Sequence, residues 1–119
     1  MHSRDMTDKQ RMEMMAEHVR DLRSLSLAGR KAFFQLARRS PFADYGIAKA
    51  LELIGEAAHY MTQTGRNQYS KIDFDKWEGL RHDLTHDYSG VELLFVWQTI
   101  EKEVPKLYNH LHNYGFISG

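Results

Sequence analysis

The chain has 119 residues, no cysteine, and 16 basic against 16 acidic side chains, so its formal net charge is zero. This length suits one domain, which we expect to cover residues 1–119, and the lack of cysteine excludes disulfides and thiolate metal sites. No apolar run approaches the roughly 18 residues that span a bilayer, and the N-terminus has no signal-peptide core. These features predict a soluble, cytoplasmic protein.

The zero net charge conceals an asymmetry along the chain. Residues 1–39 hold nine Lys/Arg and five Asp/Glu, a net of +4, and residues 40–119 carry −4. A protein that coats nucleic acid usually has a broad basic excess. Any RNA contact is therefore expected to be local, to use the basic N-terminal portion, or to be assembled across subunits.

Apolar spacing is helical almost throughout, with no convincing strand alternation. We expect residues 1–7 to form a flexible N-terminus. Thr7 is the predicted N-cap of the first helix, with Gln10 as its capping-box partner. The apolar stripe of this helix consists of Met12, Met15, Val19 and Leu22.

A break at Gly29 is predicted to separate the first helix from a short second one. The short helix carries three large apolar side chains, Phe33, Phe34 and Leu36. Four cations flank them: Arg30, Lys31, Arg38 and Arg39. These cations could contact RNA or could form a solvated face.

The clearest helix lies in "SPFADYGIAKALELIGEAAHYM". Ser40 is a suitable N-cap, and Pro41 suits the first helical position. The helical stripe comprises Ile47, Ala50, Leu51, Ile54, Ala57, Ala58 and Met61. Gly55 interrupts it at a cost of roughly 1 kcal/mol, which close approach of a neighbouring helix would explain. The segment "TGRNQYSKID" that follows is expected to be a polar loop.

The next helix is predicted to start near Asp73 or Asp75 and to end near Tyr88. It ends there because Ser89 and Glu92 form a second capping box, which starts the last helix.

The last helix contains Pro105, which is expected to kink or break it. Its apolar positions still keep the helical period: Val91, Leu94, Trp97, Ile100, Val104, Leu107 and Leu111. Together the elements predict an all-α, antiparallel up-and-down bundle of four main helices plus a short one.

Titratable groups concentrate in "GLRHDLTHDY", residues 79–88, at the end of a predicted helix. At about 100° per residue, Arg81 and Tyr88 lie about 20° apart, whereas Arg81 and His86 lie about 140° apart. Arg81 and His86 cannot easily share a ligand within one regular helix. Either the helix end is distorted or the two groups meet counterparts from another chain.

Three interpretations of this cluster are open. It could be a solvated helix face whose end Tyr88 anchors. His82 and His86 have the i, i+4 spacing of helical zinc sites, but no obvious third ligand follows. The third interpretation is acid–base chemistry on RNA, in which imidazoles transfer protons and a guanidinium stabilises the phosphorane charge.

Arg81-x4-His86-x-Tyr88 resembles the R-x4-H-x-Y motif of the HepT-like toxins, a branch of the HEPN superfamily. The resemblance extends over roughly residues 8–112. "ALELIGEAAHYM" is similar to the "IGEA" helix of that family, and "KIDFDKWEGLRHDLTHDYSGVELLFVWQTIEKEVPKL" is similar to its stretch from the loop through the final helix.

The resemblance implies an all-helical homodimer whose two motif helices face each other across a cleft. It implies a metal-independent ribonuclease, the toxin of a type VII toxin–antitoxin module, with Arg81 and His86 as the essential catalytic pair. It also implies a partner, a MntA-like nucleotidyltransferase antitoxin, that transfers AMP from ATP to Tyr88. The toxin itself would need no metal and no cofactor.

Two positions depart from the pattern of the family. His82 stands where asparagine is usual and adds a titratable group beside the site, and Ser89 stands where phenylalanine is frequent. Asp83 and Asp87 could orient the catalytic groups or merely solvate the helix. The competing functional class is a non-catalytic HEPN binding module that binds a nucleotidyltransferase and presents its substrate.

Overall fold

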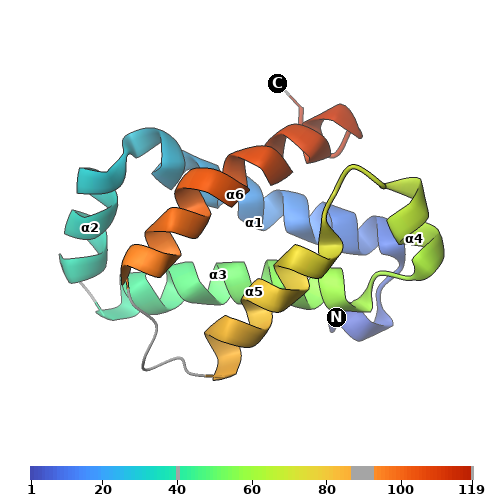
Figure 1. The fold of residues 1–119 in the computed structure, drawn as a ribbon, viewed down its shortest axis with the longest axis horizontal. Helices are drawn as coiled ribbons and strands as arrows, with labels where there is room; N and C mark the ends of the chain where they lie inside the picture. The colour runs from blue at the N-terminus through green and yellow to red at the C-terminus, as the bar shows by residue number, and fades with distance from the viewer. Residues whose placement is uncertain (40, 87–92, 119) are drawn as a thin grey trace.

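The computed structural model describes residues 1–39, 41–86 and 93–118, and over these ranges it is helical, with no strand (Figure 1). The elements are a 3-10 turn η1 (Ser3–Asp5) and the helices α1 (Asp8–Ala28), α2 (Arg30–Arg39), α3 (Pro41–Tyr60), α4 (Gln63–Gln68), α5 (Phe74–His86) and α6 (Leu93–Asn113). The predicted all-α bundle is confirmed.

Helix α3 lies at the centre of the arrangement and packs against α1 and α5 (Figure 1). Helices α1 and α3 run in opposite directions, and α6 packs along α1. Helix α2 forms one end of the molecule, where it contacts α1, α3 and the beginning of α6, and α4 lies at the opposite end. Among the described residues, no helix has the length and apolarity that crossing a membrane requires.

Local signals in the sequence set the boundaries of α1. The amide of Gln10 donates to the Thr7 hydroxyl (3.1 Å), and the amide of Thr7 donates to Oε1 of Gln10 (2.9 Å), which is the predicted capping box. Gly29 ends the helix with φ of 97°, a conformation that favours glycine. The predicted apolar stripe of α1 is fully buried: Met12, Met15, Val19 and Leu22.

The N-terminal segment, residues 1–7, makes specific contacts with the helices that follow it. Ser3 is buried, and its carbonyl oxygen accepts a hydrogen bond from Nε of Arg11 (2.8 Å). The carbonyl of Arg4 accepts a second bond from the same guanidinium (3.3 Å). These bonds join η1 to α1, and η1 also packs against α3.

The expected polar loop after α3 contains a six-residue helix, α4. Thr62 is its N-cap and accepts a hydrogen bond from the amide of Gly65 (3.1 Å). Asp8 at the start of α1 then binds Thr62, accepting from its amide (3.0 Å) and from its hydroxyl. Because Asp8 lies 54 residues before Thr62, no local pattern signals this helix start.

Helix α6 runs without a break from Leu93 to Asn113, although Pro105 lies inside it. Val104 and Leu107 on either side of the proline are buried, and their packing outweighs the hydrogen bond that proline cannot donate. Of the expected kink or break at Pro105, the break does not occur. Leu94, assigned to the apolar stripe, is 40% exposed. The predicted caps at Ser40, Ser89 and Glu92, and the stripe position Val91, lie outside the described residues.

Candidate active site on helix α5

Helix α5 carries the motif arginine, and its N-terminal half fixes it in the bundle. The side chain of Asp73 caps the helix by accepting from the amide of Lys76 (3.1 Å). Phe74 and Trp77 are both buried in the core. Arg81 follows one turn after Trp77 and is partly buried.

Gly55 of α3 lies directly against this turn of α5. A Cβ placed on Gly55 would lie 2.6 Å from the carbonyl oxygen of Trp77 and 3.2 Å from Cα of Arg81, and would overlap Cβ of Arg81. Only a glycine permits this approach of the two helices. The expectation that Gly55 reflects helix packing is confirmed, and its consequence is that Arg81 is seated on α3.

A second set of contacts joins α3, α4 and α5 one turn before Arg81. Oε1 of Glu78 is hydrogen-bonded to Nδ1 of His59 (2.8 Å), and this bond is the main reason that the pKa of Glu78 lies below its usual value. Arg66 of α4 donates to Asp75 (2.7 Å) and to the carbonyl oxygen of Ala58 near the end of α3 (2.7 Å). These bonds hold α5 in its position on α3.

This network was not predicted from the sequence. Glu78 and His59 are 19 residues apart and belong to different helices, so their pairing has no spacing signal. The short spacing between Arg66 and Asp75 is equally uninformative, because a turn of chain separates the two helices that carry them.

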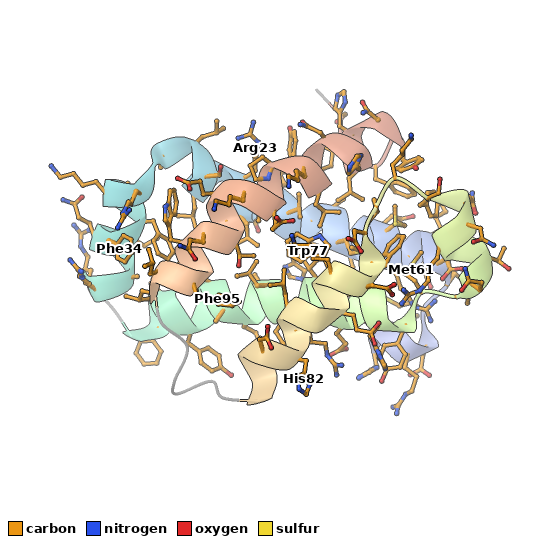
Figure 2. The ribbon with its side chains drawn as sticks, viewed as in Figure 1. Arg23, Phe34, Met61, Trp77, His82 and Phe95 are labelled. Atoms are coloured by element: carbon orange, nitrogen blue, oxygen red, sulfur yellow. The ribbon has the colours of Figure 1, made fainter. Side chains whose placement is uncertain are left out.

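The other face of α5 is exposed. His82 and Asp83 are exposed, and Figure 2 shows His82 pointing away from the helix. A shallow depression lies on this face of α5. It is lined by Asp75, Lys76, Glu78, Gly79, Leu80, His82 and Asp83. Position 86 follows one turn after His82, on the same face of the helix.

Helix α5 extends regularly to His86, five positions and about 140° beyond Arg81. A distortion of the helix before His86 therefore does not bring the two positions onto one face. The side chain of His86 lies outside the described part of the chain, as do Asp87, Tyr88 and Ser89.

Within the described residues, no three histidine, aspartate or glutamate side chains gather in a group that could hold a metal ion. The pair of His82 with His86, considered above as a zinc site, lies partly outside the described residues because the side chain of His86 does.

The comparisons with known proteins agree with the family resemblance of the motif on α5. The family model described as "Ribonuclease HepT-like" matches residues 15–113. The chain belongs to the HepT-like family. The matched region contains Gly55, Arg81 and His86, together with all of α2 to α6.

Three relatives of this HepT-like chain are named as ribonucleases, and each of these names is an inferred one. A Caldanaerobacter subterraneus protein named RNase is 35% identical over 58% of this chain and 62% of its own length. A Methanocaldococcus jannaschii protein named RNase is 38% identical over 53% and 52%. A Thermococcus cleftensis protein named ribonuclease HepT is 29% identical over 53% and 57%. The chain thus spans little more than half the length of these relatives, and no solved structure matches it.

The basic residues singled out in the sequence gather at a different place in this HepT-like fold. All four lie exposed on α2, at the end of the bundle: Arg30, Lys31, Arg38 and Arg39. The structure therefore brings these cations together with one another, on a helix other than the one that carries Arg81.

Proposed function

We propose that this protein is a metal-independent endoribonuclease and the toxin of a type VII toxin–antitoxin module. The observation that carries the proposal is the HepT-like family match over residues 15–113, within which Arg81 of the R-x4-H-x-Y motif is seated on α3 by Gly55. This contact fixes the backbone position from which the Arg81 guanidinium reaches, and fixed positioning of a charged group favours charge that develops in a transition state.

In the proposed reaction His86 acts in proton transfer and Arg81 binds the phosphate. A base removes the proton of the RNA 2′-OH, the 2′ oxygen attacks the adjacent phosphorus, and the bond to the 5′ oxygen breaks as that oxygen gains a proton. The products are a 2′,3′-cyclic phosphate and a 5′-hydroxyl. The guanidinium of Arg81 stabilises the added negative charge on the phosphorane oxygens.

The active unit in this proposal is a homodimer. Positions 81 and 86 lie about 140° apart on a regular helix, so a site built within one chain would need the substrate to reach around α5. Two α5 helices facing each other across a two-fold axis would bring Arg81 of one chain towards His86 of the other. His82, Asp83 and Asp87 would then surround the shared site and orient its groups.

Regulation in this proposal acts on Tyr88, two residues after His86. A MntA-like nucleotidyltransferase partner transfers AMP from ATP to the phenol oxygen, with pyrophosphate leaving. The added phosphate brings negative charge and the adenosine brings bulk, and both oppose binding of RNA in a cleft that binds anions. ATP serves the partner as the AMP donor, and the toxin uses no cofactor of its own.

The deciding experiment is cleavage of total tRNA and of a short mixed-sequence RNA by purified protein of confirmed unmodified mass, in EDTA. Wild type should release fragments with cyclic-phosphate ends, whereas His86→Ala and Arg81→Ala should not. His112→Ala, which changes an exposed histidine of α6, is the matched control and should cleave like wild type. If unmodified wild type leaves both RNAs intact, the non-catalytic binding module replaces the nuclease.

A further inference from the structure

Helix α2 presents two parallel rows of side chains on its solvent face. One row has the spacing i, i+4, i+8 and consists of Arg30, Phe34 and Arg38. The second row lies beside it with the same spacing and consists of Lys31, Gln35 and Arg39. These six residues line one open pocket, while Phe33 and Ala37 on the other side of the helix are buried in the core.

Phe34 holds the two arginines of the first row. The guanidinium carbons of Arg30 and Arg38 lie 5.6 Å and 5.3 Å from the centre of its ring. The ring is itself fixed by an edge-on contact with buried Phe33, at 5.1 Å between centroids. Figure 2 shows Phe34 on α2 at the end of the bundle. Cation–π contacts of this kind order side chains that would otherwise lose conformational entropy when they bind a ligand.

Among the described residues, no acidic side chain is paired with the cations of this surface. The sequence has no Asp or Glu from residue 22 to residue 43. Arg11 and Arg66, in contrast, are bound to Asp8 and Asp75.

We infer that the solvent face of α2 binds the phosphate backbone of the RNA substrate, at a place separate from the motif on α5. The inference rests on the proposed ribonuclease function. Each row extends over eight residue steps, about 12 Å along the helix, which is long enough to contact several successive phosphates. Guanidinium groups bind phosphate oxygens through two parallel hydrogen bonds. The Phe34 ring holds the guanidinium groups of Arg30 and Arg38 in place.

The position of α2 in the fold suits this role. Helix α2 contacts α6, and Phe33 lies against Trp97 in the first turns of that helix, at 5.4 Å between ring centroids. Helix α6 is the next described element after α5, and its first turns lie beside α2 at this end of the bundle (Figure 1). RNA held on α2 would be retained near the protein while a neighbouring segment is cleaved.

The test measures how the affinity for a short single-stranded RNA depends on salt, with His86→Ala as the background so that the RNA stays intact. Each phosphate contact adds about 0.7 to the slope of log affinity against log salt for a single strand. Replacing Lys31 and Arg39 by glutamine should lower that slope by about 1.4, and replacing all four cations should lower it by about 2.8. The control Lys9→Gln/Arg20→Gln removes one lysine and one arginine from exposed positions of α1 and should leave the slope unchanged.

The inference is overturned if the α2 variants keep the slope of the control while circular dichroism shows a native fold. It is also overturned if the α2 variants lose binding to poly-glutamate but keep their affinity for RNA, because α2 would then be a surface for an acidic protein. The Lys31/Arg39 double variant retains the Arg30–Phe34–Arg38 row, so its salt dependence can be measured even if the quadruple variant fails to fold. Because binding is measured without cleavage, failure of the nuclease proposal leaves this result interpretable.

Discussion

Gly55 on α3 and Arg81 on α5 are in direct backbone contact, at a point where a methyl group on the glycine would overlap Cβ of the arginine. The neighbouring atoms are the carbonyl oxygen of Trp77 and Cα of Arg81, and neither can move without moving α5. The glycine of the "IGEA" segment thus sets the separation of the two helices, and through it the position of the motif arginine.

Gly55→Ala should destabilise the protein and impair its activity together. Overpacking a core contact typically costs about 1–3 kcal/mol, which exceeds the gain of up to about 1 kcal/mol when alanine replaces glycine in a helix. We expect a lower free energy of unfolding in urea, and cleavage reduced beyond what unfolding explains because Arg81 is displaced. Gly46→Ala is the matched control in the same helix: its Cβ meets nothing within 4 Å, so it should stabilise slightly. Equal effects of the two substitutions would contradict this assignment of Gly55.

Asp8 should make the stability of the protein depend on acid pH. Burial alone would raise the pKa of this carboxyl, but hydrogen bonds from Thr62 and Arg11 outweigh burial and hold the pKa below its usual value. A carboxyl with a lowered folded-state pKa stabilises the protein at pH values above its unfolded-state pKa, and this contribution is lost as pH falls through the folded-state value. Asp8→Asn should cost about 1–3 kcal/mol near neutral pH.

Urea unfolding of both proteins from neutral pH down to about pH 3 measures the contribution of Asp8. The difference between wild type and Asp8→Asn should shrink as pH falls, because the wild-type carboxyl becomes protonated. Glu78, whose pKa is also lowered, remains in both proteins and cancels in the difference. A difference that stays constant over this range would show that Asp8 has no altered pKa.

The features that could be predicted from the sequence are those encoded within a few residues. Thr7 and Gln10 form a reciprocal cap three residues apart, Gly29 ends α1 with a positive φ, and Asp73 caps α5 as expected. The role of Gly55 in helix packing was predictable because glycine destabilises a helix, and close contact with a neighbouring helix is the usual explanation for a glycine in a strong helix.

The features that could not be predicted depend on residues far apart in the chain. Helix α4 has weak intrinsic propensity, and its start is fixed by Asp8 from α1. The bond between His59 and Glu78 joins two helices whose relative position is set by Gly55. The continuity of α6 through Pro105 was unpredictable for a related reason: burial on both sides of the proline, which depends on the rest of the bundle, overrides its local tendency to end a helix.

Tyr88→Phe should separate cleavage from its regulation. The substitution removes the phenol oxygen that is proposed to accept AMP but leaves Arg81 and His86 in place, so cleavage by purified protein should persist. Incubation with the partner nucleotidyltransferase and ATP should add one AMP to wild type, detected by intact mass, and should abolish its cleavage. The phenylalanine variant should show neither change. Tyr45→Phe, at an exposed tyrosine of α3, is the control and should be modified and inhibited like wild type.

Mixing two inactive variants tests whether each site uses both chains. A dimer of one Arg81→Ala chain and one His86→Ala chain would have two shared sites. If each site takes Arg81 from one chain and His86 from the other, one of the two sites keeps both residues and the second site lacks both. Since half of randomly mixed dimers are of this kind, activity should recover to about a quarter of wild type. Mixing His86→Ala with the Arg81→Ala/His86→Ala double variant provides the control, in which nothing should recover. A site built within one chain would give no recovery in either mixture, and the 140° separation of the two positions would then have to be bridged by the substrate.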